Sequence, residues 1–333
     1  MRVPLVRMHG DALPLLEVRD DRPRIERRAT VRRAEGTTFY EVRARSAIER
    51  VPAETGLPQE WAVNPYRGCG HACRHCGARS GHRRLGLDTG SGFETGIVVK
   101  TDVAARLRAE LAADGRGRAL AVGVSGDCYQ VAEERYRLMP GVLAALRDAG
   151  ASFRVYTKSS LVLRDAEVLA QAASVADAAV SVSVAFVDER IRRVVEPGAP
   201  SAQRRLELLS ALAERGVPAE AVMGPILPLL TDSPDQLAAT VRRIAAAGAG
   251  GVRPVVLRLP PGTREWYMRW LEADHPGLVP RYAELYDRVG RPDAAYAERV
   301  CAEVAALARV YGLGVARPVV PPAGPRFPQL ALL

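Results

Sequence analysis

Hydrophobic and polar positions alternate with two different periods between about residue 60 and residue 275. Short apolar runs, rich in β-branched residues, predict buried strands, and each precedes a segment whose apolar residues recur every three or four positions, which predicts an amphipathic helix. The predicted strands cover residues 61–66, 118–125, 151–159, 178–186, 217–227 and 251–259, and the predicted helices cover residues 101–111, 136–150, 161–173, 201–216, 233–249 and 263–273. Six such units are typical of a parallel sheet covered by helices, as an incomplete barrel or a doubly wound sheet.

The segments on either side of this regular region have a different character. Residues 1–58 are charged and poorly periodic, and we expect an N-terminal extension, partly disordered, in which the stretch RDDRPRIERRATVRR is exposed. Residues 59–275 form the predicted core. Residues 276–333 hold two helical stretches, at 278–288 and 293–311, and then a tail that proline keeps irregular.

Composition places the chain among ordinary globular proteins. It has 333 residues, 48% hydrophobic and 26% charged. The N-terminal stretch MRVPLVRMHGDALPLLEVRDD lacks the apolar core of a signal peptide, and no segment approaches the roughly twenty apolar residues of a membrane helix. We therefore expect a cytoplasmic protein without a membrane partner.

The net charge of +9 comes almost entirely from arginine, because only Lys100 and Lys158 of the 47 basic residues are lysines. An arginine bias fits a GC-rich genome as well as it fits phosphate binding. Many arginines stand in helical segments near acidic residues, as on a solvated face, although a positive field would still attract polyanions. A lysine retained where arginine is the rule indicates a need for a compact charge.

Three of the five cysteines stand close together, at Cys69, Cys73 and Cys76, just after the first predicted strand. In βα barrels the loops at the carboxyl ends of the strands build the active site, so these thiols lie where chemistry is expected. They do not form an even disulfide framework, and a reducing compartment keeps them available as metal ligands. Cys128 and Cys301 are distant in sequence.

Two metal sites compete for the three thiolates. A structural zinc ion needs a fourth ligand, which His71, His75 or His82 could supply. A four-iron cluster can be held by three thiolates, which leaves one iron without a protein ligand. The spacing C-x3-C-x2-C, with no fourth cysteine nearby, favours the cluster.

The same motif resembles the cluster-binding sequence of the radical SAM superfamily, whose members bind the amino and carboxylate groups of S-adenosylmethionine at the open iron. More narrowly, the chain resembles a bacterial branch that is related to spore photoproduct lyase and often labelled DNA repair photolyase. The stretches that carry this resemblance are FYEVRARSAIERVP, WAVNPYRGCGHAC, LGLDTGSGFETGIVVK, VYTKSSLVLRD and REWYMRWLEADHPGLVPRYAELY, between about residues 37 and 312.

The resemblance implies a fold and a cofactor. The fold is α/β, with residues 59–275 as the radical SAM core, a partial (β/α)6 barrel of the TIM type between an N-terminal extension and C-terminal helices. Cys69, Cys73 and Cys76 would hold a [4Fe-4S] cluster.

The resemblance also assigns residues to S-adenosylmethionine. The turn from Gly123 to Asp127, which includes Ser125, would approach the amino group. Lys158 would pair with the carboxylate, unless it is a surface lysine whose stem snorkels.

The remaining ligand contacts are expected on later strands. Ser183 would reach the ligand or else bond a backbone carbonyl, and Glu196 would contact the ribose. Gly224 and Ile226 would form a ledge for adenine or simply belong to the core.

The chain departs from the family pattern at several positions. His75 stands where members carry an aromatic residue before the last cysteine, and Gly77 stands where relatives have Tyr or Phe. The loop Gly123–Gln130 reads GVSGDCYQ, where close relatives resemble GGNTDPYQ. The cysteines are intact, so these departures bear on the substrate more than on the cluster.

Cys128 lies on that loop and is the candidate catalytic residue. Spore photoproduct lyases carry a cysteine on the equivalent loop that returns a hydrogen atom to the product radical, and a thiol suits that role because its S–H bond is weak. The alternative is a small buried filler. Tyr129, Gln130, Glu133 and His82 would line the mouth of the barrel or else be loop residues without a role.

The implied activity is reductive cleavage of S-adenosylmethionine to a 5′-deoxyadenosyl radical, which abstracts hydrogen from a substrate. We expect flavodoxin or ferredoxin as electron donor, and a photolyase-like lyase reaction on nucleic acid is one expectation for the substrate. A barrel of six strands is open at one side, which admits a bulky substrate. The alternative function is a zinc-stabilised, non-catalytic nucleic-acid-binding protein.

Overall fold

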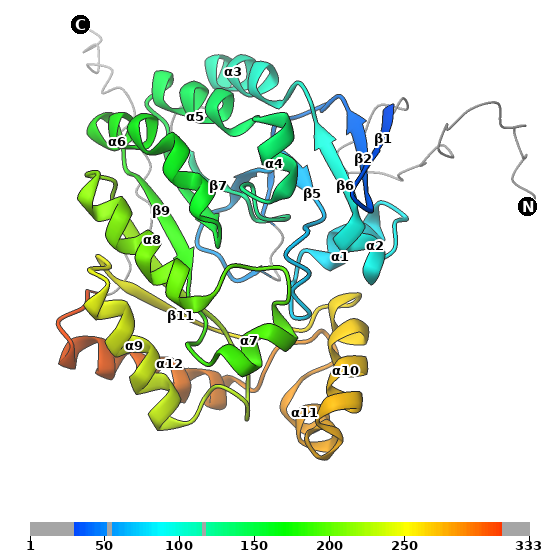
Figure 1. Cartoon of the computed structure of the whole chain (residues 1–333), viewed down its shortest axis with the longest axis vertical. Coiled ribbons are helices and arrows are strands. Elements are labelled where there is room, and N and C mark those ends of the chain that lie inside the picture. The colour runs from blue at the N-terminus through cyan, green and yellow to red at the C-terminus, as the bar shows by residue number, and fades with distance from the viewer. Residues whose placement is uncertain (1–29, 52–54, 115–117, 315–333) are drawn as a thin grey trace, which may run out of the picture.

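Six parallel strands form the main sheet of the computed structural model, which describes residues 30–51, 55–114 and 118–314 (Figure 1). The strands are β4 (Trp61–Val63), β7 (Ala119–Val122), β8 (Ser152–Thr157), β9 (Ala178–Ser183), β10 (Ala219–Ile226) and β11 (Val252–Val256). Each pairs in parallel with the next one along the chain. A doubly wound sheet reverses its strand order near the middle, so this continuous order confirms the predicted partial barrel.

The two edges of the sheet leave the barrel open on one side. The short strand β3 (Ile48–Arg50) pairs antiparallel with β4 and forms one edge, and β11 forms the other. Within the described ranges these two edges do not pair with each other. The opening therefore lies between β3 and β11.

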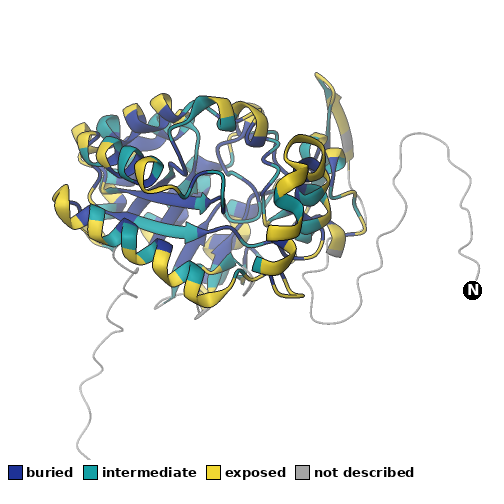
Figure 2. Cartoon of the chain, turned by 90° about the horizontal axis from the view of Figure 1, so that it is seen from below, coloured by how far each residue is buried: buried dark blue, intermediate teal, exposed yellow. Residues whose placement is uncertain are grey.

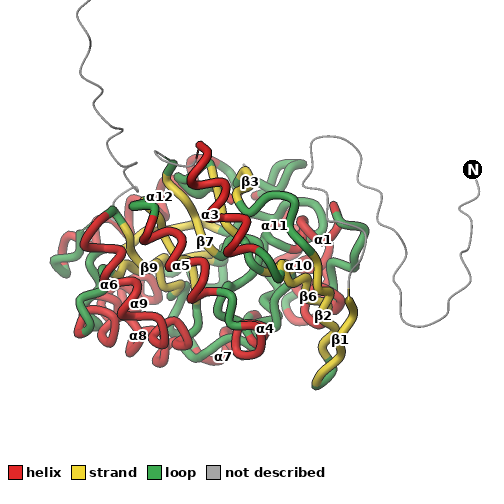
Figure 3. The backbone as a smooth tube through the Cα atoms, turned by 90° about the horizontal axis from the view of Figure 1, so that it is seen from above, coloured by secondary structure: helices red, strands yellow, loops and turns green. Residues whose placement is uncertain are grey.

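Helices cover the outer face of the sheet (Figure 3). Those that follow a strand are α3 (Val103–Asp114), α5 (Met139–Asp148), α6 (Ala166–Val175), α8 (Ala202–Glu214) and α9 (Pro234–Ala246). In α9, Ser233 and Gln236 form a reciprocal capping box, and Leu237, Val241 and Ile244 lie on the buried face. The helical periodicity thus predicted these five helices correctly.

The sixth predicted helix forms, but it does not cover the last strand. α10 (Thr263–Asp274) continues into the 3-10 turn η3 (Pro276–Leu278) and α11 (Val279–Leu285), and it packs against both. Tyr267 and Trp270 join Leu257, which directly follows β11, in a second apolar cluster. The place beside β11 and α9 is taken by α12 (Ala294–Val310).

Short helices lie in the loops that follow the strands. They are α1 (Arg79–Arg84), α2 (Ser91–Thr95), α4 (Val131–Tyr136), η2 (Ser160–Asp165) and α7 (Glu189–Val195). A search of the described helices finds none that is both long enough and apolar enough to cross a membrane.

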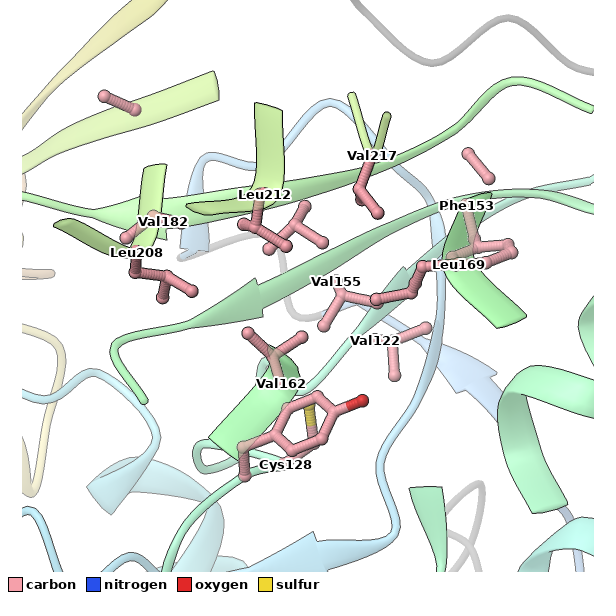
Figure 4. Close-up of a cluster of buried hydrophobic side chains, with 14 of the residues drawn as sticks. Val122, Cys128, Phe153, Val155, Val162, Leu169, Val182, Leu208, Leu212 and Val217 are labelled. Carbon is pink, nitrogen blue, oxygen red and sulfur yellow. The ribbon is translucent and has the colours of Figure 1, made fainter. Parts of the chain in front are cut away.

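The core lies between the sheet and the helices. Figure 2 shows buried residues on the strands and on the inner sides of the helices, with exposed residues on the outer sides. In the close-up of Figure 4, Val155 and Val182 on the strands face Leu169 of α6 and Leu208 and Leu212 of α8. Every strand thus meets apolar partners, which explains the nearly continuous apolar runs.

A second sheet, which the sequence analysis did not predict, packs beside the barrel. Its strand order is β1 (Thr30–Ala34), β2 (Thr37–Val42), β6 (Gly96–Lys100) and β5 (Tyr66–Arg67). The extension expected at residues 1–58 thus supplies β1, β2 and β3, and β3 pairs with β4 across the expected boundary. The stretch RDDRPRIERRATVRR, expected to be exposed and disordered, is described only from Thr30, where it forms the start of β1 with Thr30, Arg32 and Arg33 exposed. The rest of that stretch and the irregular tail expected at 317–333 fall outside the described residues.

Candidate active site

A cavity of about 270 Å³ lies at the carboxyl ends of the parallel strands. Its wall contains most of the residues that the sequence analysis proposed as ligands. These are Cys69, Cys73, Cys76, Gly123, Asp127, Lys158, Ser183 and Gly224. The fold therefore brings residues from five loops and strands to one space, in the place expected for a barrel enzyme.

The cysteine loop, residues 68–76, is held by three side chains from outside it. The carboxamide of Gln130 donates to the carbonyl of Gly68 at 2.7 Å and accepts from the amide of Gly70 at 3.1 Å. The fully buried guanidinium of Arg79 donates from Nε and Nη2 to the carbonyl of Cys73, at 3.1 and 3.0 Å. The Thr263 hydroxyl, at the start of α10, donates to the carbonyl of Cys76 at 2.9 Å.

The three thiols are not gathered around a single tetrahedral metal ion. Zinc–sulfur bonds of about 2.3 Å in a tetrahedron put sulfur atoms about 3.8 Å apart. Cys69, Cys73 and Cys76 do not all lie within 4.8 Å of one another; in the described ranges the one group of ligand atoms that does is Cys73, His75 and Glu196. His75 and Glu196 are already joined, with 3.0 Å between Nε2 and Oε1.

The thiols of Cys69 and Cys73 are buried, so they need a bound cation in order to ionise. Burial, and after it the carboxylate of Asp127, raises the pKa of the Cys69 thiol to about 12. Burial, and after it the carboxylate of Glu196, raises the pKa of Cys73 well above its usual value. A metal centre lowers thiol pKa values because it binds the thiolate. The donor set is therefore suited to a cluster.

Asp127 joins the loop after β7 to the end of β8. Its Oδ1 accepts from the hydroxyl of Thr157 at 2.7 Å and from the amide of Tyr129 at 2.9 Å. Its Oδ2 accepts from the amide of Lys158 at 2.7 Å. The Asp127 carboxylate thus positions the backbone of the residue that carries the ammonium group.

Lys158 points into the cavity rather than along the surface. Its Nζ donates to the Ser183 hydroxyl at 2.8 Å and lies 3.6 Å from Glu196 Oε1, and its side chain is 15% exposed. The Ser183 hydroxyl in turn donates to the carbonyl of Gly224 at 3.0 Å. Three predicted ligand residues are therefore connected, and the snorkelling alternative for Lys158 is wrong.

Two predicted ligand residues have other roles. Glu196 caps the carboxyl end of α7 and is completely buried. Its carboxylate binds His75, Lys158 and Arg205. It does not line the cavity, so it is not available to a ribose. Ser125 is also outside the cavity wall, and its amide donates to Asn64 Oδ1 at 2.8 Å.

The structure does not support a catalytic role for Cys128. Its side chain is completely buried in the main core, beside Val122 and Val162 in Figure 4, and is not part of the cavity wall. Its sulfur lies 4.0 Å from the carbonyl oxygen of Tyr156. Gly123, which adopts a positive φ of 86°, leaves room for this side chain, since a Cβ atom added at Gly123 would lie 2.7 Å from the Cys128 sulfur. A hydrogen donor has to reach the substrate, so the structure favours the filler.

The expected mouth residues are also buried and do not line the cavity. Glu133 accepts from the Tyr66 hydroxyl at 2.6 Å and binds Arg164, and Tyr129 donates to a buried carboxylate. His82 meets the ring of Phe93 edge to face. Gln130 braces the cysteine loop, as described above, so it supports the site from behind.

Two parts of the site were missed by sequence reasoning. Arg258 lines the cavity just after β11, and its guanidinium lies against Gly56, where an added Cβ atom would be 3.3 Å from Cζ. It therefore spans the open side of the barrel, from the end of β11 to the segment between β3 and β4. Asn64 binds the loop after β7. Its place between the first strand and Pro65, directly before the cysteine loop, is the signal that could have identified it.

Sequence comparison places the chain among known proteins. The Radical SAM superfamily model matches residues 63–244. An uncharacterised protein of Mycobacterium tuberculosis is 44% identical over 289 residues, which are 86% of this chain and 85% of that protein. An uncharacterised protein of Methanocaldococcus jannaschii is 27% identical over 173 residues, which are 52% of this chain and 62% of that protein.

Solved structures with a similar fold include spore photoproduct lyase. Its complex with dinucleoside spore photoproduct superposes with a TM-score of 0.61 at 15% sequence identity, covering 82% of this chain and 79% of the other. A single-site variant of that enzyme gives a TM-score of 0.58 at 16% identity, covering 77% and 75%. A family match over more than half of the chain, together with a relative that is 44% identical over most of both proteins, shows that the chain belongs to the radical SAM superfamily.

Proposed function

We propose that this protein holds a [4Fe-4S] cluster on Cys69, Cys73 and Cys76 and cleaves S-adenosylmethionine beside it. The observation that carries the proposal is the shared cavity, whose wall contains the three cysteines together with Lys158. The cluster would supply the electron that breaks a carbon–sulfur bond of the sulfonium and yields the 5′-deoxyadenosyl radical.

The cavity wall offers a partner for each part of S-adenosylmethionine. The Lys158 ammonium, held in place by Ser183, would bind the carboxylate. Backbone carbonyls of the loop after β7 would accept from the amino group. Val222 and Val255 contribute apolar surface for the adenine and exclude water from the radical.

Anaerobic reconstitution tests this proposal. The reconstituted protein, with dithionite and S-adenosylmethionine, should form 5′-deoxyadenosine, and Cys73→Ala should form none. Cys301→Ala is the matched control because Cys301 lies on α12, outside the cavity wall, and it should retain the activity. A wild-type protein that carries a cluster and forms no 5′-deoxyadenosine would sink the proposal.

For the substrate we propose a nucleic acid, on which the enzyme acts in a lyase-like reaction. Three observations support this: the net charge of +9, the open side of the barrel, and the arginine that spans the opening. A structure of similar fold, spore photoproduct lyase, is known in complex with a dinucleoside photoproduct.

Isotope transfer distinguishes a substrate from a polyanion that merely binds. Deuterated DNA and RNA, undamaged or irradiated, are incubated with the active enzyme, and deuterium in 5′-deoxyadenosine is measured by mass spectrometry. Transfer from one of them supports the proposal. If all of them leave the product unlabelled while uncoupled cleavage continues, the substrate is of another class.

The electron is proposed to come from flavodoxin or ferredoxin, in a reducing cytoplasm that would keep the thiols free. Either reduced protein should replace dithionite in the assay.

A further inference from the structure

Glu49 is a buried carboxylate that connects two loops of the site, although it belongs to the predicted extension. Its side chain is 10% exposed and lies on the edge strand β3. Oε2 accepts from Arg67 at 2.5 Å and lies 3.4 Å from the Lys100 ammonium, while Oε1 accepts from the Asn64 amide at 2.7 Å. None of these four residues lines the cavity.

Asn64 extends this network to the cavity wall. Its Oδ1 accepts from the backbone amides of Val124 and Ser125, both at 2.8 Å. In a trans peptide the N–H and C=O bonds point in opposite directions, so the carbonyls of Gly123 and Val124 point away from Asn64. Because both residues line the cavity, Asn64 fixes two backbone acceptors at its wall, as an ammonium ligand requires.

Arg67 extends the same network to the cysteines. It ends β5 and is separated from Cys69 only by Gly68. The Gly68 carbonyl closely approaches the loop after β7, since a Cβ atom added at Gly126 would lie 2.5 Å from its oxygen. The cysteine loop and the loop after β7 are therefore packed backbone against backbone. Glu49 binds Arg67, which precedes the cysteine loop, and Asn64, which binds the loop after β7.

We propose that Glu49 is a positioning residue for S-adenosylmethionine, which acts through Asn64 on the carbonyls of Gly123 and Val124 and through Arg67 on the cysteine loop. The proposal rests on the proposed function of this cavity. Glu49 makes no contact with the ligand, so its loss should weaken ligand binding while the cluster remains.

The test measures S-adenosylmethionine affinity and iron content on the anaerobically reconstituted, full-length protein. Glu49→Gln keeps an acceptor for Asn64 but removes the charge, and Asn64→Ala removes the acceptor for both loop amides while leaving the ion pairs intact. Each should raise the Kd roughly tenfold, the loss of about one oriented hydrogen bond, with iron per chain unchanged. The change that the ligand causes in the electron paramagnetic resonance spectrum of the reduced cluster should weaken in parallel.

The control is Asp177→Asn. Asp177 pairs with the buried Arg154 at 2.8 Å near the amino end of β9, far from the cavity wall, so its loss should lower stability without changing the Kd. If Glu49→Gln does not fold, the Kd of the Asn64→Ala variant alone decides whether the proposal stands.

A double-variant cycle separates positioning from general destabilisation. If Glu49 acts mainly through Asn64, Glu49→Gln should change the Kd by less than about twofold in the Asn64→Ala background. Folded variants that bind the ligand as tightly as wild type overturn this proposal and leave the proposed function intact, and two effects that simply add overturn the route through Asn64. Absence of ligand binding by the wild-type holoprotein overturns both.

Discussion

Lys158 shows how a single residue of the site depends on its neighbours. Burial alone lowers the pKa of a lysine, but the carboxylate of Glu196, followed by the sulfur of Cys73, outweighs burial and raises it. Glu196 remains ionised because Arg205 and then Lys158 outweigh its burial and hold its pKa well below the usual range. The cavity wall therefore keeps a fixed positive charge at assay pH.

Replacement of Lys158 by alanine should weaken S-adenosylmethionine binding and leave the cluster in place. A charge-assisted hydrogen bond contributes about 1.5 to 3 kcal/mol, so the Kd should rise roughly ten- to a hundredfold. Equilibrium binding to the reconstituted variant, with iron content as the control, measures this. Unchanged affinity would remove Lys158 from the ligand site.

Replacement of Cys128 by alanine should leave the chemistry unchanged. Because the thiol lies in the core, the variant should lose about 1 kcal/mol of unfolding free energy and cleave S-adenosylmethionine at the normal rate. Urea unfolding and product analysis check the two parts. Normal cleavage with stalled or altered conversion of the substrate would instead restore Cys128 as the hydrogen donor.

The sequence predicted those site residues whose position follows from a strand end or a local motif. Lys158 reaches the cavity because it directly follows β8, and Cys69, Cys73 and Cys76 reach it on the loop that follows β5. Cys128 was misplaced because the direction of its side chain depends on the turn that begins at Gly123, and spacing along the chain does not reveal that turn.

At the scale of elements, β3 and the loop after β7 form one unit with the cysteine loop. Lys100, followed by Arg67, outweighs burial and lowers the pKa of Glu49 to about 2. The sequence did not reveal this unit because β3 has only three residues, too few for a readable period, and its partners come from distant segments.

The low pKa of Glu49 has a consequence for stability in acid. A carboxyl group with a lowered pKa stabilises the fold above its unfolded pKa of 4.5, and this contribution is lost as the pH falls from about 5 toward 2. Between pH 7 and pH 4 the wild-type protein should lose about 1 kcal/mol at this site.

Urea unfolding at both pH values measures the difference between wild type and Glu49→Gln. The variant should be less stable at pH 7, since it leaves two buried cations unpaired, and its stability should fall less at pH 4. Equal losses in the two proteins would show that Glu49 does not keep its charge in acid.

At the scale of the whole molecule, the open side of the barrel is the route by which a large substrate reaches the cavity. Arg258 spans this opening. Arg147 lies at the end of α5, beside the amino end of β8. Replacement of either arginine by alanine lowers the net charge by the same amount. If nucleic acid enters here, Arg258→Ala should weaken its binding and reduce the slope of log Kd against log salt by about 1.

Arg147→Ala is the matched control and should leave both the affinity and the slope unchanged. Fluorescence anisotropy with a labelled oligonucleotide, over a series of salt concentrations, gives both quantities. Equal effects of the two substitutions would indicate a diffuse electrostatic contact away from the cavity.

The overall architecture followed from the sequence because six strand–helix units leave few possible topologies. The second sheet and the position of α10 did not, since both depend on contacts between distant segments, such as Phe39 with Ile97 and Tyr267 with Leu227. Local periodicity carries no information about these pairs.

The metal content of the protein purified without oxygen tests the central claim most directly. The account predicts a brown protein with about four irons and four acid-labile sulfides per chain, retained in Cys301→Ala and lost in Cys73→Ala. A colourless protein that carries stoichiometric zinc and no sulfide would contradict it.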